Sequence, residues 1–98
     1  MTQFATNQVL VPTGGTQIVD GTSAITSFKS CCIQATADTV ISVCTGINGN
    51  DDTTTVNFKT DTKYNWLNLK AGDVLYTKNA DYITAITLTS GRILLHKI

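Results

Sequence analysis

Short runs of alternating apolar and polar residues follow one another along this chain, separated by turn-forming residues roughly every eight to twelve positions. Alternation with a period of two predicts β-strands, because successive side chains of a strand point to opposite faces. The runs that fit this pattern are residues 8–11, 16–19, 24–36, 39–45, 53–59, 64–69, 74–78, 82–89 and 93–98. We therefore expect an all-β fold, a single β-sandwich of about eight or nine short antiparallel strands, of which a jelly-roll is one form.

Individual runs carry further information about their place in the fold. Ile25 and Phe28 fall on different parities, so the long run 24–36 is expected to change phase or form a bulge between them. Residues 39–45 are apolar on both faces, which favours a central strand. In the run 53–59, Val56 and Phe58 share one face, which predicts one face in the core and one in water.

The apolar pattern continues to the C-terminus, so the last run, 93–98, is expected to be paired rather than frayed. A chain of 98 residues suits one domain, residues 1–98, with residues 1–7 as a candidate N-terminal arm. Threonine is the commonest residue and glutamate is absent, a composition that favours strands over helices.

Net charge and hydropathy exclude several classes of partner. Seven basic and seven acidic residues give a net charge of zero, so the chain lacks the basic surface on which nucleic-acid binding depends. The apolar runs are too short for a signal peptide or a membrane span. We therefore expect neither nucleic acid nor membrane as a partner.

Few residue types suited to catalysis are present. His96 is the only histidine and lies in an apolar terminal run, which does not favour a Ser-His-Asp or Cys-His arrangement. Every aspartate falls in or beside a turn, where aspartate is favoured for local hydrogen bonds. These patterns predict a protein that is not an enzyme and that needs no cofactor.

The loop around residues 48–52 is the one candidate ion site. Asn50, Asp51 and Asp52 cluster oxygen ligands of the kind that a hard cation such as calcium prefers. Their spacing lacks the alternating acidic positions and the distal glutamate of an EF-hand. A solvated hairpin loop is therefore favoured over a metal site.

Three cysteines, Cys31, Cys32 and Cys44, cannot all pair within one chain. We expect three reduced thiols, at least two of them buried, while a bridge from Cys44 to either neighbour in the pair stays open. A structural zinc site is not expected, because four nitrogen or sulfur ligands at suitable spacing are lacking.

Aromatic residues supply the candidate contact surface. If Leu67 faces the core, then Tyr64 and Trp66 share the opposite face, where they suit a protein interface or a sugar platform. The reverse assignment buries Trp66, and burial is favoured for a lone tryptophan in a small domain. Phe4 is a third candidate contact, an aromatic anchor in a polar N-terminal segment.

The run AGDVLY at residues 71–76, followed by ITAITLTSGRIL at residues 83–94, resembles small tailed-phage structural proteins, in particular capsid decoration (cement) or head-fibre modules. The resemblance covers about the last thirty residues. It implies a β-sandwich that binds the outside of an icosahedral shell, often as a trimer, without chemistry. It also implies that residues 1–11 lie on the capsid as an arm and that threonine-rich faces contact other subunits.

We therefore expect a virion protein on the capsid exterior, whose partners are the major capsid protein and copies of itself as a homotrimer. The alternative is a carbohydrate-binding or receptor-binding β-sandwich module, which the aromatic residues and the acidic loop would serve.

Overall fold

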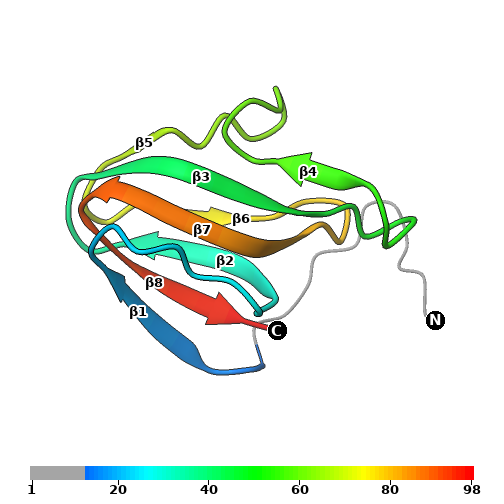
Figure 1. The fold of residues 1–98 in the computed structure, drawn as a ribbon, viewed down its shortest axis with the longest axis horizontal. Helices are drawn as coiled ribbons and strands as arrows, with labels where there is room; N and C mark the ends of the chain where they lie inside the picture. Colours follow the sequence, from blue (N-terminus) through cyan, green and yellow to red (C-terminus); the bar gives the residue numbers. More distant parts are fainter. Residues whose placement is uncertain (1–12) are drawn as a thin grey trace.

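The structure, a computed structural model, describes residues 13–98, which form eight antiparallel β-strands and no helix (Figure 1). The all-β prediction is confirmed. The strands are β1 (Thr16–Asp20), β2 (Ser30–Ala35), β3 (Thr39–Ile47), β4 (Thr55–Asn57), β5 (Asn68–Leu69), β6 (Val74–Tyr76), β7 (Tyr82–Ser90) and β8 (Arg92–Lys97). The strand predicted at residues 8–11, the arm at 1–7 and Phe4 lie outside the described residues.

All eight strands belong to one hydrogen-bonded sheet in the order β1-β8-β2-β7-β3-β4, with β5 beside β3 and β6 beside β2. Strand β2 is where the sheet divides. Its residues 32–34 pair with β8 on one side and β6 on the other, whereas its only pairing with β7 is Ser30 opposite Ile83. The strands therefore form two groups, β1-β8-β2-β6 and β7-β3 with β4 and β5.

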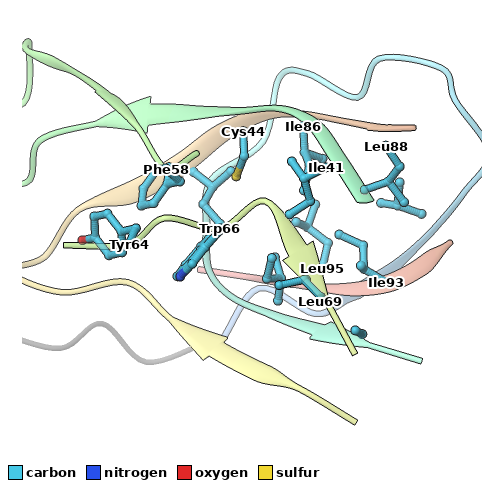
Figure 2. Close-up of a cluster of buried hydrophobic side chains, with 14 of the residues drawn as sticks. Ile41, Cys44, Phe58, Tyr64, Trp66, Leu69, Ile86, Leu88, Ile93 and Leu95 are labelled. Atoms are coloured by element: carbon cyan, nitrogen blue, oxygen red, sulfur yellow. The ribbon is translucent and has the colours of Figure 1, made fainter. Parts of the chain in front are cut away.

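The core lies between these two groups of strands. Ile33, Ile93 and Leu95 of the first group belong to the same buried cluster as Ile41 and Ile86 of the second. Figure 2 shows side chains from both groups pointing toward one another. Because hydrogen bonds join all strands in one sheet, the finer description as a sandwich or jelly-roll stays a prediction.

The expected change of phase in residues 24–36 is a complete break. Ile25 pairs with Ile86 of β7 in an isolated bridge, and β2 begins only at Ser30. Between them, Ser27 has a left-handed φ of 63°, which no regular strand accommodates. The apolar residues on the two sides of Ser27 consequently reach the core from different directions.

Strand β3 lies inside the sheet as predicted, between β7 on one side and β4 and β5 on the other. Its apolar side chains are not all buried, however. Ile41 and Cys44 are fully buried, but Val43 is 41% exposed. Register shifts on both sides of Ile41 disturb the alternation and turn Val43 to solvent.

The paired C-terminus is confirmed, but the hairpin expected from Ser90-Gly91 is not formed, because β8 pairs with β1 and β2 and not with β7. Gly91 connects β7 to β8 with a φ of 97°, and a Cβ there would lie 2.3 Å from Thr39 Oγ1. Lys97 N donates to Gly15 O, and Gly14 N donates to Lys97 O, both at 2.8 Å. Strand β8 is therefore held between β1 and β2 over its whole length.

Candidate functional site

Tyr64 and Trp66, candidates for a contact surface if their face were exposed, lie in a buried aromatic cluster with Phe58. The ring centroid of Phe58 lies 4.5 Å from that of Tyr64 and 5.0 Å from that of Trp66 (Figure 2). All three residues are at most 8% exposed. The favoured burial of Trp66 is confirmed, and the exposure that an interface or sugar-binding role for Tyr64 and Trp66 required is not met.

Residues 64–69 were expected to alternate as a strand, and this is wrong for most of the segment. Backbone N–H groups of Tyr64 and Asn65 both donate to Asp61 O, and Asn65 has a left-handed φ of 55°. This turn sends Tyr64, Trp66 and Leu69 into the core and leaves Leu67 40% exposed. Only Asn68–Leu69 pairs as β5.

Asp81 is the polar residue that sequence reasoning missed. It does lie next to a turn, but its side chain is fully buried. Tyr64 Oη donates to Asp81 Oδ2 over 2.8 Å, and Gly49 N donates to Asp81 Oδ1 over 3.1 Å. Lys63 Nζ lies 3.5 Å from Oδ2 and is partly exposed. The sequence holds no signal for this burial, because the partners come from two distant segments, Gly49 and Lys63–Tyr64.

This arrangement ties loops together and does not suit proton transfer. Burial raises the pKa of Tyr64, and the hydrogen bond to the Asp81 carboxylate raises this pKa as well. Tyr64 therefore stays a neutral donor at physiological pH. Among the described residues, every buried side-chain nitrogen or oxygen atom has a hydrogen-bond partner. We interpret the Asp81 cluster as structural.

The candidate ion loop uses its carboxylates internally. Asp51 Oδ1 accepts the backbone N–H groups of Thr53 and Thr54, each over 2.9 Å. The hydrogen bond from the Thr54 hydroxyl, followed by these two backbone bonds, lowers the pKa of Asp51 to about 2. Asp52 accepts a hydrogen bond from the hydroxyl of Tyr82. The structure thus places Asn50, Asp51 and Asp52 in one turn but directs the two carboxylates away from a common centre.

A shallow groove of about 520 Å³ lies beside that turn, where Ser27–Lys29 passes the first residues of β7. Phe28, Ile47 and Tyr82 form its apolar lining, and Lys29 Nζ lies 5.2 Å from the Tyr82 ring centroid. Burial and the bond to Asp52 raise the pKa of Tyr82 to about 12. One cation over one aromatic ring does not define a ligand.

The three cysteines are free and buried. Burial raises the pKa of Cys44 to about 12 and also raises the pKa values of Cys31 and Cys32. Protonated thiols in such surroundings are poor nucleophiles. His96 Nδ1 lies 3.1 Å from Thr16 Oγ1. Within residues 13–98, no group of three or more His, Cys or Asp side chains is placed to hold a metal ion.

The outer face of β1, β8, β2 and β6 is the most distinctive exposed surface. Ile18 is 55% exposed, Tyr76 53% and Val74 44%. They are three of the six large hydrophobic residues that are exposed in the described part of the chain. Scattered apolar residues are ordinary on a protein surface, but several on one sheet face indicate a contact region.

Comparisons with known proteins find no relative of the chain. No protein-family model matches it, and searches of curated proteins and of solved structures give no significant match. No helix within the described range has the length and apolar character to cross a membrane. The function must therefore be argued from the residues.

Proposed function

We propose that this chain is a non-enzymatic virion protein of a tailed phage that decorates the capsid exterior and works by binding other subunits. The observation that carries the proposal is the outer face of β1, β8, β2 and β6, which exposes Ile18, Val74 and Tyr76. Protein interfaces are enriched in aromatic residues, and this face exposes Tyr76 beside two aliphatic side chains.

The remaining polar groups support the same proposal. The carboxylates of Asp51, Asp52 and Asp81 are engaged in hydrogen bonds within the fold. Burial keeps the three thiols protonated. The resemblance of residues 71–76 and 83–94 to decoration modules adds the capsid as the partner, with the homotrimer as the assembly that it implies. The carbohydrate-binding alternative has lost the exposed aromatic pair on which it rested.

The test mixes the full chain with shells assembled from the major capsid protein of the same phage. After sedimentation of the shells, the bound chain is measured in the pellet, and its position is located by electron microscopy. We expect saturable binding at repeated sites on the outer surface. Absence of binding at saturating concentration, or retention of the chain on a glycan column together with no shell binding, would overturn the proposal.

A truncated variant separates the arm from the described fold. Deleting residues 1–7, the candidate N-terminal arm, should abolish shell binding. Its thermal transition should stay close to that of the full chain, because strand β1 begins at Thr16. Undiminished occupancy of shells by the truncated variant would refute the arm while leaving decoration itself supported by the full-chain result.

A further inference from the structure

The outer face of β1, β8, β2 and β6 consists of two cross-strand rows in register. The first row contains Thr16, His96, Cys32 and Tyr76, and the second contains Ile18, Leu94, Gln34 and Val74. Their neighbours along the strands, Ile33 and Leu95, point into the core, so the two rows lie on the opposite face. Four of the eight residues are exposed there, three are partly buried, and Cys32 is buried.

Neither row contains an aspartate, lysine or arginine. The first charged pair in register, Asp20 opposite Arg92, stands at the end of the face. Both outermost strands, β1 and β6, carry an exposed aliphatic side chain in the second row, Ile18 at one margin and Val74 at the other. The face is therefore uncharged at its centre and apolar at both margins.

We propose that this face packs against the same face of a second copy of the chain, about a two-fold axis parallel to the strands. Such an axis exchanges β1 with β6 and β8 with β2. It brings Ile18 of one copy onto Val74 of the other, and Leu94 onto Gln34. In the second row the apolar side chains at the two edges therefore meet each other, and in the first row Tyr76 of one copy meets Thr16 of the other.

Charge is the reason for choosing a second copy as the occupant. A partner with a charged surface would lose hydration on this face without gaining an opposite charge. A copy offers the same uncharged rows, and a net charge of zero removes long-range repulsion between copies. Two sheets stacked about 10 Å apart bury side chains of both faces in this way.

The size of the face sets the expected affinity. Four strands at the usual spacing of about 4.8 Å make a face roughly 19 Å wide. Two rows, two residues apart along the strands, extend about 14 Å in the other direction, so the face covers roughly 270 Å², about a third of the ~800 Å² that a standard interface buries on each partner. We therefore expect a weak dimer, with a dissociation constant of about 0.1 mM. The two-fold contact produces pairs, so the homotrimer implied by the resemblance would need a different contact.

Sedimentation equilibrium over a concentration series tests the proposal with the full chain. The wild type should approach twice the 10.5 kDa mass of one chain. Val74→Asp should raise the dimer dissociation constant at least about tenfold, because it places an unpaired carboxylate in the contact. Val43→Asp is the matched control, since Val43 is exposed to 41%, close to the 44% of Val74, but lies on β3 outside the face. It should change the constant less than about twofold.

A charge pair tests the axis itself. Ile18→Lys alone should weaken the dimer like Val74→Asp, while the double variant should regain an affinity within about threefold of wild type. Within one copy the two positions are three strand spacings apart, about 14 Å, so the recovery requires contact between copies. Circular dichroism on each variant identifies any loss of fold. If a charged variant does not fold, Ile18→Gln and Val74→Gln are used in place of Ile18→Lys and Val74→Asp, and each should weaken the dimer.

A wild type that stays monomeric at millimolar concentration would overturn the inference, as would a trimer indifferent to Val74→Asp or a double variant that stays dissociated. The inference does not rest on the proposed function. A monomer that decorates shells refutes only the dimer, and a dimer that ignores shells refutes only the virion role.

Discussion

The hydroxyl of Tyr64 donates a 2.8 Å hydrogen bond to the carboxylate of Asp81, a side chain with no exposed surface. The same hydroxyl accepts the backbone N–H of Lys78 over 2.9 Å. One phenol therefore satisfies a buried charge and a backbone donor together. Because a buried carboxylate is stable only with its hydrogen bonds, the aromatic cluster and the turn before β7 depend on each other.

Tyr64→Phe tests this dependence. The substitution keeps the ring between Phe58 and Trp66 but removes the hydroxyl, so it should lower the free energy of unfolding by about 1–3 kcal/mol. Urea denaturation at neutral pH measures the loss. Tyr76→Phe is the control, because the Tyr76 ring is 53% exposed, and it should stay within about 0.5 kcal/mol of wild type. Equal effects of the two substitutions would contradict the structural role of Asp81.

The hydrophobic pattern predicted those parts of the fold where alternation alone decides burial. In residues 53–59 it placed Val56 and Phe58 in the core, and both are buried. The favoured burial of Trp66 is confirmed, but the strand expected over residues 64–69 is not formed at Tyr64, because the left-handed φ of Asn65 and the hydrogen bond from Trp66 N to Phe58 O replace it. Alternation describes extended backbone only, so a turn that directs two side chains into one core leaves no periodic signal.

The candidate site shows the same limit. Asp81 stands in a sequence that is typical of a solvated turn. Its burial results from contacts with Gly49 and Tyr64, which lie 32 and 17 residues away in the chain. The outer face was equally hidden, because Ile18 and Val74 come together only through the strand order β1-β8-β2-β6. Long-range pairing, which a single sequence does not encode as a pattern, determines both features.

Acid titration should reveal the hydrogen bonds of the 48–52 loop. The pKa of Asp51 is about 2 in the folded chain, below the ordinary value of 3.8. The folded state favours the ionised form of Asp51. The contribution of this carboxylate to the stability of the fold is therefore complete at a pH above its ordinary pKa of 3.8, and it is lost as the pH falls toward 2. NMR titration of the carboxyl carbon measures this pKa.

Thr54→Val should raise the pKa of Asp51 toward 3.8, since the Thr54 hydroxyl is the largest cause of the lowered value. Thr55→Val is the matched control, because Thr55 is exposed at the start of β4 and should leave the Asp51 pKa unchanged. If calcium shifted the Asp51 resonance in the wild type and stabilised it against heat, the loop would be an ion site after all.

Thiol reactivity should distinguish folded from unfolded chains completely. Cys31, Cys32 and Cys44 are buried with raised pKa values, so a thiol reagent in native buffer should react with none of them rapidly. In concentrated guanidinium chloride, which unfolds the chain, the reagent should react with three thiols. A count of one in the unfolded chain would instead establish a disulfide, whose reduction should then cost about 2–4 kcal/mol.

Gly49→Ala should destabilise the fold through a clash with backbone. A Cβ at this position would lie 2.0 Å from the carbonyl oxygen of Ala80, and the N–H of Gly49 would move away from the Asp81 carboxylate. Together these effects should lower the free energy of unfolding by about 2–4 kcal/mol. The double variant Gly49→Ala/Ala80→Gly separates the causes, because it removes the Ala80 methyl group but not its carbonyl. Ala80 has a left-handed φ of 60°, which glycine adopts more easily, so Ala80→Gly is also measured alone. We expect the double variant to regain no more than this single substitution gains, as measured by urea denaturation. Full recovery would show that the methyl group, 2.7 Å from the new Cβ, is the obstacle, and that the backbone can move without breaking the bond from Gly49 to Asp81.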